Sequence, residues 1–444
     1  MRTANIATRV NTVTMKTTFI NIKKKLGIKY AFHKTYRQWK RINAGIQPCE
    51  SKRKHLIIVP CDPWSVGGSR GDEAMIMAVI HKYRHKFPQI PISIVCAEGK
   101  GMSYIEQFPI EGVRPINSWT GSYPLERIYQ SILKVQPSDV VILGADCMDG
   151  FYSPLLSLTL LALHDLCANT IGISSYLLGF SFNSKPNWMM IRAFRSLSND
   201  TVVSIRDAIS LERYQQKVGK PARLVADAAF MLQPEKSFHL YEEIAQWVSG
   251  QKTASRVVIG LNFHPMLRKY NGADDIKSDA LKLAIIIEEI LLRHKNISFV
   301  FISHDDRSKL TDNLMLSNMV NYLKSQSDEL IERVFYRQEV PRAHQLKALC
   351  GLLDGLISSR MHLAIAALGM GTPVMAATYQ GKFEGLFKHF ELDRTYLLEP
   401  NLFLSSRMIA VFENFIENLH TIKKQINTNL PQVLAYSNAN LKDE

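Results

Sequence analysis

The sequence predicts an α/β protein with two doubly wound, Rossmann-like domains, each built on a parallel sheet. The chain has 444 residues, of which 46% are hydrophobic, and this is enough to bury two or three separate cores. Short runs rich in Ile and Val recur along it, and helical stretches separate these runs. Strands that are apolar on both faces and alternate with helices are typical of a parallel sheet covered on both sides.

The first domain is predicted between residues 55 and 198. Its strands are apolar runs bounded by breaking residues: His55–Pro60, Pro91–Ala97, Asp139–Gly144 and Thr170–Tyr176. Its helices have apolar residues at helical spacing: Asp72–Phe87, Leu125–Val135, Ser153–Cys167 and Asn187–Ser198. Because strands and helices alternate, neighbouring strands are expected to run parallel.

The second domain is predicted between residues 199 and 404, where the alternation resumes. Its predicted strands are Thr201–Ile205, Arg256–Asn262, Ile297–Ser303, Arg333–Tyr336, Gly355–Ser358 and Pro373–Thr378. Its predicted helices are Asp207–Val218, Asp275–His294, Thr311–Ser325, Ala343–Leu353, Met361–Leu368 and Lys382–Phe390. A helix and linker fit residues 234–255. Residues 405–444 are expected to form a helix to about Ile426 and then a polar, frayed tail.

The formal net charge of +14 belongs almost entirely to a basic N-terminal extension, residues 1–54. These residues hold fourteen Lys or Arg and one acid, Glu50, so they carry +13 and leave +1 for the other 390 residues. A nucleic-acid partner is not expected, because it would require a basic surface on the folded body. The extension mixes its cations with Trp, Phe and Ile, which suits an anionic membrane surface. A solvated tail or a helix packed on the body explains the same residues, so these alternatives stay open.

Nothing in the sequence predicts secretion, a membrane span or a metal centre. The six cysteines form no CxxC pair, as expected for thiols in a reducing compartment. The longest apolar stretch, Pro154–Leu163, is too short to cross a bilayer. His264, His304 and His344 are scattered and are interpreted as loop or cap residues. We therefore expect a cytoplasmic protein, peripheral at the inner face of the membrane if the extension binds lipid.

Three segments place polar residues where strands are predicted to end, at the edge where parallel sheets bind ligands. The first is a glycine-rich turn, Gly67–Ala74, in which Gly71 permits close backbone approach and Asp72 could cap a helix or meet a sugar hydroxyl. The second is Arg206-Asp207, whose arginine can hold a phosphate or a carboxylate with its planar fork. The alternatives are a plain tight turn for the first segment and an Arg206–Asp207 contact for the second.

The third segment, Gly355–Lys382, carries the densest set of functional groups. Arg360, His362 and Lys382 are predicted at one edge of the sheet. Two fixed cations and a histidine that titrates near neutrality suit an anionic substrate and a proton transfer. A lone histidine at a helix start is more often a cap or a packing residue, but the cationic neighbours favour the functional interpretation.

The run S-x-R-x-H, followed by A-L-x-x-G-T-P-V and Y-x-x-K-F-x-G-L, resembles the C-terminal signature of the polysaccharide pyruvyl transferase family. Weaker motifs precede it in the family's order: the G-D-E-A turn, the R-D-x-x-S at Arg206 and the D-A-A-F that begins at Asp227. The resemblance spans about residues 60–395. Two departures lie in the first domain, where Leu143–Cys147 stands in place of a glycine run and Leu178–Phe182 in place of a Gly-Pro turn.

The resemblance implies a fold similar to that of GT-B glycosyltransferases and transfer of a pyruvyl group from phosphoenolpyruvate. The usual product is a ketal that bridges two hydroxyls of a sugar in an exopolysaccharide or its lipid-linked precursor. Carried over from the family, four residues surround the donor: Arg206, Arg360, His362 and Lys382. We expect His362 to act as the acid or acid/base, while the three cations hold the phosphate and the carboxylate. Neither a cofactor nor a metal is expected, and the further candidates for substrate contact are Gly71, Asp72 and Tyr379.

Two other functions stay open. A GT-B glycosyltransferase that uses a nucleotide sugar would be expected to place acidic residues near its donor, and the segment from Arg360 to Lys382 contains none. A non-catalytic, membrane-associated interaction protein would not need the set formed by Arg360, His362 and Lys382.

Overall fold

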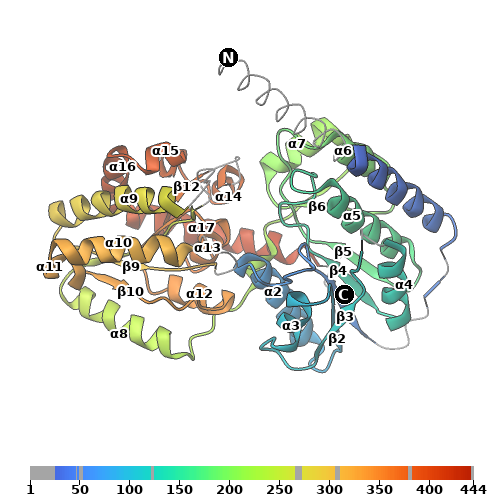
Figure 1. The fold of residues 1–444 in the computed structure, drawn as a ribbon, viewed down its shortest axis with the longest axis horizontal. Coiled ribbons are helices and arrows are strands. Elements are labelled where there is room, and N and C mark those ends of the chain that lie inside the picture. Colours follow the sequence, from blue (N-terminus) through green and yellow to red (C-terminus); the bar gives the residue numbers. More distant parts are fainter. Residues whose placement is uncertain are drawn as a thin grey trace, which may run out of the picture.

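Two parallel sheets, each with helices on its faces, lie side by side in the computed structural model (Figure 1). The model describes residues 26–46, 48–49, 54–121, 125–265, 273–305, 311–378 and 383–441. The strand order is β3-β2-β1-β4-β5 in the first sheet and β10-β9-β8-β11-β12-β13 in the second. All pairings within them are parallel. The predicted α/β class with two Rossmann-like sheets is therefore confirmed.

The first sheet consists of β1 Leu56–Val59, β2 Ile92–Cys96, β3 Val113–Asn117, β4 Asp139–Ile142 and β5 Ser174–Leu177. Its helices are α2 Arg70–Lys86, α3 Lys100–Glu106, α4 Leu125–Val135, α5 Pro154–Asn169 and α6 Trp188–Arg195. In register, Ile57 of β1 lies between Ser93 of β2 and Val140 of β4. Strands β1, β2 and β4 are buried at every position. Most of their residues are therefore apolar, and these apolar runs in the sequence predict the strands. The edge strand β3 is only half-buried and contains Pro115, so no apolar run marks it.

Residues 204–231 stay with the first sheet. The short strands β6 Ser204–Ile205 and β7 Arg223–Leu224 pair with each other, and Ile205 forms a bridge with Phe180 beyond β5. Helix α7 Ala208–Val218 packs on α6, and the 3-10 helix η1 Ala228–Met231 packs on α2. The sequence predicts a domain boundary between residues 198 and 199. These contacts fit a boundary after η1 better, and we propose to place it there.

The second sheet consists of β8 Val257–Asn262, β9 Ile297–Phe301, β10 Val334–Tyr336, β11 Gly355–Ser358, β12 Val374–Ala377 and β13 Leu397–Leu398. Its helices are α8 His239–Thr253, α9 Ala273–Arg293, α10 Asp312–Gln326, α11 Asp328–Glu332, α12 Ala343–Cys350, α13 Met361–Leu368 and α14 Phe383–His389. Strands β8, β9 and β11 at its centre are almost wholly buried. Two short elements, η3 Arg394–Tyr396 and α15 Pro400–Phe403, lead to the last helices.

The last helix returns to the first sheet. Helix α16 Arg407–Glu417 is followed by α17 Leu419–Asn438, which spans the region between the sheets (Figure 1). Beyond it Asn440 accepts a hydrogen bond from Gly179 N at 2.7 Å and donates one to Ala226 O at 2.8 Å. The frayed tail expected after about Ile426 is therefore wrong, because polar side chains in this segment satisfy buried backbone groups of the first half.

An N-terminal helix, residues 26–43, packs on the first sheet's helices. Phe32 and Trp39 are buried, and Trp39 Nε1 donates to Asp165 Oδ2 at 2.9 Å. For these residues the structure matches the alternative of a helix packed on the body, while residues 1–25 lie outside the described part. No helix in the described ranges is both long and apolar enough to cross a membrane.

Candidate active site

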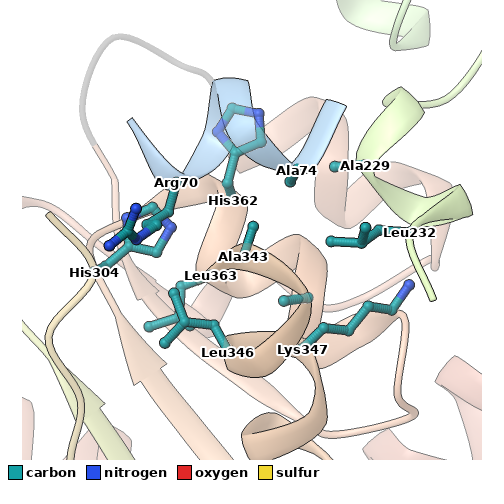
Figure 2. Close-up of a pocket in the computed structure, with 11 residues that line it drawn as sticks. Arg70, Ala74, Ala229, Leu232, His304, Ala343, Leu346, Lys347, His362 and Leu363 are labelled. Atoms are coloured by element: carbon teal, nitrogen blue, oxygen red, sulfur yellow. The ribbon is translucent and has the colours of Figure 1, made fainter. Parts of the chain in front are cut away.

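A pocket lies where the carboxyl edges of the two sheets face each other. Helices α2 and η1 come from the first half of the chain, whereas α12 and α13 follow strands of the second sheet. Figure 2 shows the residues that line the pocket: Arg70, Ala74, Ala229, Leu232, His304, Ala343, Leu346, Lys347, His362, Leu363 and Ala366. All four of its ionisable lining residues are basic: Arg70, His304, Lys347 and His362.

His362 lies in the first turn of α13, directly after β11, and its imidazole crosses to α2. A Cβ atom placed on Gly71 would come within 2.6 Å of His362 Cγ and 2.7 Å of Cε1. Only glycine therefore allows the ring to approach the α2 backbone this closely. The other side of the ring faces Asp227, with 3.7 Å between Nε2 and Oδ2. The structure thus brings together Gly71 and His362, two residues predicted from distant segments.

Arg206 lies behind this histidine and is almost completely buried. Its Nη1 forms an ion pair with Asp227 Oδ2 at 2.9 Å, and its Nε donates to Ser181 Oγ at 2.7 Å. Its Nη2 contacts the Met361 sulfur at 3.4 Å. The Arg206–Asp207 contact considered as an alternative is not what fixes the turn: Asp207 caps α7 by accepting from Ser210 N at 2.7 Å.

Arg360 is held by two acids of the second half of the chain. It donates to Asp312 at 2.6 Å and to Asp305 at 3.1 Å, and its side chain is 12% exposed. Burial raises the pKa of Asp312, and the Arg360 guanidinium opposes this effect. The segment from Arg360 to Lys382 contains no acidic residue. The fold nevertheless places two acids beside Arg360, and both come from other segments of the chain.

Asp72 does not cap α2. Ser69 is the N-cap and accepts from Gly71 N at 3.3 Å, while Asp72 Oδ1 accepts from the buried Cys61 thiol at 3.2 Å. Of the two alternatives for Asp72, the helix cap is wrong, because Ser69 takes that position, and the contact with a sugar hydroxyl stays a prediction. Two other predicted site residues, Tyr379 and Lys382, lie outside the described residues.

Glu73 joins the two halves of the chain next to the pocket residue Arg70, and sequence reasoning did not single it out. Its carboxylate is fully buried and accepts from the Tyr104 hydroxyl at 2.6 Å and from Arg70 at 3.1 Å. It also accepts from Ala343 N at 2.8 Å, and so caps α12 across the interface. Glu73 is the third residue of the G-D-E-A motif, but this motif does not reveal a partner 270 positions away.

Two further pocket residues are not predicted as site residues from the sequence. His304 is interpreted there as a loop or cap residue, and Lys347 is not singled out. His304 is 5% exposed, and burial together with Arg360 holds the pKa of its ring well below the usual range. Lys347 donates to Phe230 O at 2.9 Å, and burial lowers its pKa to about 8. Figure 2 shows the Lys347 side chain extending away from the Arg70–His304 side of the pocket.

The arrangement suits an anionic ligand and proton transfer. Basic side chains line the pocket, and buried carboxylates behind them hold the arginines in place, so the cations are preorganised before a substrate arrives. A histidine within reach of this pocket supplies a group that can gain and lose a proton near neutral pH. Within the described ranges, no group of three or more His, Cys, Asp or Glu side chains could hold a metal ion.

Residues 70–381 match the family model described as polysaccharide pyruvyl transferase. A comparison with curated proteins returned no match.

Solved structures with the same fold include a Listeria monocytogenes protein described as a UDP-N-acetylglucosamine 2-epimerase, with a TM-score of 0.54 and 14% identity over 87% of this chain and 94% of that one. A Siraitia grosvenorii UGT transferase in complex with UDP gives a TM-score of 0.51 and 12% identity, covering 86% and 95% of the two chains. A Rickettsia africae glycosyltransferase gives 0.51 and 12%, covering 88% and 100%. At these identities the likeness concerns the fold, which is GT-B-like.

Proposed function

The chain belongs to the polysaccharide pyruvyl transferase family, and from this premise we propose that it transfers the pyruvyl group of phosphoenolpyruvate to two hydroxyls of a sugar, forming a ketal. The acceptor is a polysaccharide or its lipid-linked precursor. One observation carries the proposal: His362 projects from the start of α13 into a pocket whose ionisable lining is basic, at the junction of the two halves. Phosphoenolpyruvate carries a phosphate and a carboxylate, so it needs such a lining.

In the proposed reaction, a sugar hydroxyl adds to C2 of phosphoenolpyruvate while C3 takes up a proton. His362 donates this proton, and the positive charge that develops at C2 is spread as in an oxocarbenium ion. A second hydroxyl of the same sugar then attacks C2, the bond from C2 to the phosphate oxygen breaks, and inorganic phosphate leaves. One hydroxyl proton replaces the proton that His362 gave, and the phosphate takes the other.

The cations divide between holding the donor and holding the site. Arg360 is partly exposed beside the pocket residue His304, so we propose that it contacts an anionic group of the donor while Asp305 and Asp312 fix its orientation. Lys382 is proposed for the same role from the family motif. No cofactor is proposed.

The test is incubation of the purified protein with phosphoenolpyruvate and a panel of glycans and lipid-linked sugars. Phosphate release together with a mass gain of the acceptor is the expected result. His362→Asn should abolish both while leaving the melting temperature close to that of the wild type. His420→Asn, which changes an exposed histidine on α17, is the matched control and should keep full turnover. If phosphoenolpyruvate neither binds nor turns over with any acceptor, the proposal is wrong.

The alternative donor is a nucleotide sugar, which the GT-B-like fold alone would allow. The same panel therefore includes UDP-sugars as donors. Release of UDP with glycosylated acceptor, in place of phosphate release, would assign the protein to that class and would remove the proposed role of His362 as a proton donor to C3.

We also propose that the outer face of the N-terminal helix binds anionic lipid headgroups. Lys29, Lys34 and Arg37 are exposed on it, together with Tyr30, and the chain has no acidic residue before Glu50. Each cation near such a surface contributes about 1 kcal/mol. The test is co-sedimentation with phosphatidylglycerol vesicles and with phosphatidylcholine vesicles. Binding to the anionic vesicles alone, weakened in the Lys34→Glu, Arg37→Glu double variant, is expected, whereas equal sedimentation of both proteins would contradict the proposal.

A further inference from the structure

A continuous chain of polar contacts runs from β5 to the proposed catalytic histidine. Ser181 Oγ accepts from Arg206 Nε at 2.7 Å, Arg206 Nη1 donates to Asp227 Oδ2 at 2.9 Å, and the same carboxylate oxygen lies 3.7 Å from His362 Nε2. Arg206 and Asp227 side chains are each 2% exposed. These contacts therefore join three segments of the first half to a helix of the second half through buried charges.

Contacts hold Arg206 at all three nitrogens of its guanidinium group. Its Nε and Nη1 donate to Ser181 and Asp227, and its Nη2 lies against the sulfur of Met361. Removal of the Arg206 side chain would leave the buried Asp227 carboxylate without its partner, which costs several kcal/mol. Arg360 is also engaged at all three nitrogens, by Asp305 and Asp312, but its side chain is 12% exposed against 2% for Arg206.

We infer that Asp227 is a positioning residue for His362 and that Arg206 acts on this histidine through its ion pair with Asp227. The inference rests on the proposed function for its chemical meaning. The carboxylate fixes the side of the ring on which Nε2 lies and stabilises the imidazolium, while the guanidinium limits that stabilisation by sharing the same oxygen. Together they set how readily His362 gives up its proton.

The backbone around Asp227 is built to hold the carboxylate still. Oδ1 accepts from Ala229 N at 3.0 Å and so caps η1. The Asp227 carbonyl accepts from Ser437 Oγ at 2.7 Å, and the preceding carbonyl accepts from Asn440 at 2.8 Å. Helix α17 and the residues after it thus hold the Asp227 backbone, and Oδ2 is the oxygen that faces Arg206 and His362.

Other charged groups lie near His362, and one of them is Lys347 of α12, which lines the same pocket. Those from α2, from the loop after β9 and from the start of α13 are Arg70, Asp72, Glu73, His304, Asp305 and Arg360. Most of them are paired with each other, as Arg70 is with Glu73 and Arg360 with Asp305. A substitution of Asp227 or Arg206 leaves these pairs in place, so its effect on the histidine can be measured against a constant background.

The experiment is NMR titration of the full-length protein labelled at histidine Cε1, with the His362 signal assigned by its loss in His362→Asn. In Asp227→Asn the amide can still cap η1, but the charge is gone, so the titration midpoint of His362 should fall by about one pH unit. In Arg206→Gln the Asp227 carboxylate no longer pairs with a guanidinium. It therefore stabilises the His362 imidazolium more strongly, and the titration midpoint of His362 should rise. Asp354→Asn, which removes a carboxylate paired with the distant Lys252, is the control and should leave the midpoint unchanged.

Opposite shifts in the two variants support the inference, and a purely structural role would produce neither. An unchanged midpoint in either folded variant, or shifts of the same sign in both, overturns it. If Asp227→Asn does not fold, Arg206→Gln alone still decides by the sign of its shift. The titration needs no substrate, so its outcome is separate from that of the turnover assay.

Where turnover is measurable, Asp227→Asn should lower kcat more than it raises KM for phosphoenolpyruvate, and its loss of activity at high pH should begin at a lower pH. Asp227→Glu should restore part of the pH profile because it restores the charge. A rise in KM with unchanged kcat in the Arg206 variant would instead mean that Arg206 binds the donor.

Discussion

Substitution of Gly71 by alanine should disable the site without harming the fold. Gly71 lies in the first turn of α2 with an ordinary helical backbone, where alanine is preferred to glycine by about 1 kcal/mol. The added methyl group, however, would lie 2.7 Å from His362 Cε1. Carbon atoms in contact sit about 3.5–4.0 Å apart, so the ring must move by about 1 Å. Because the imidazole can rotate about its side-chain bonds, it will yield before the helix does.

A displacement of this size at the proton donor is expected to lower kcat/KM for phosphoenolpyruvate about 100-fold, which is about 2.7 kcal/mol of transition-state stabilisation. The assay is phosphate release at several donor concentrations, with the melting temperature measured in parallel. Gly250→Ala in α8 is the matched control, because a Cβ atom there meets nothing within 4 Å; it should keep wild-type kcat/KM. Wild-type activity in Gly71→Ala would refute the close packing of His362 on α2 as a requirement for turnover.

Three further changes test other parts of the structure. Lys347→Met removes a buried ammonium whose folded pKa of about 8 lies below its unfolded value of 10.5; the ammonium therefore costs stability below pH 8, at most about 3 kcal/mol. Between pH 8 and 10.5 the unfolding free energy of the wild type should rise relative to that of the variant, and parallel curves would contradict this. Glu73→Gln should lower the melting temperature markedly, by a loss of about 3 kcal/mol, because the amide cannot accept from both Arg70 and the α12 N-terminus; an unchanged melting temperature would mean that the interface does not depend on this carboxylate. Trp39→Phe loses the hydrogen bond to Asp165, about 1–2 kcal/mol, and should make the N-terminal helix easier to cleave in limited proteolysis, whereas equal cleavage rates would contradict its anchoring role.

The parts of the fold that could be predicted are those whose burial is complete. Strands such as β4 and β11 are buried at every position, so most of their residues are apolar and the sequence predicts them. β3 and the two-residue strands β7 and β13 are short or partly exposed, and their pairing depends on neighbours already in place. The C-terminal segment misleads for the opposite reason: Ser437 and Asn440 are polar but buried, because they bond to backbone groups that no local pattern reveals.

The candidate site was likewise predictable from the sequence only in part. The rule that ligands bind at the carboxyl edge of a parallel sheet places Arg360 and His362 correctly at the end of β11. It cannot say which acid each cation meets. Three aspartates reach the site from elements far along the chain: Asp227, Asp305 and Asp312. Both arginines are paired with such acids, and only tertiary packing makes Arg206 fully buried and Arg360 partly exposed.

The return of α17 to the first half has a consequence for biosynthesis. Ser437 and Asn440 hold the two carbonyls at Asp227 and Ala226, so the backbone beside the proposed catalytic histidine is secured by residues made more than 200 positions later. During synthesis, both sheets can form before Ser437 and Asn440 make these hydrogen bonds. We therefore expect the nascent protein to have both sheets folded while the backbone at Asp227 is still not held in place. The site should be completed only when residue 440 has left the ribosome and packed against the first half.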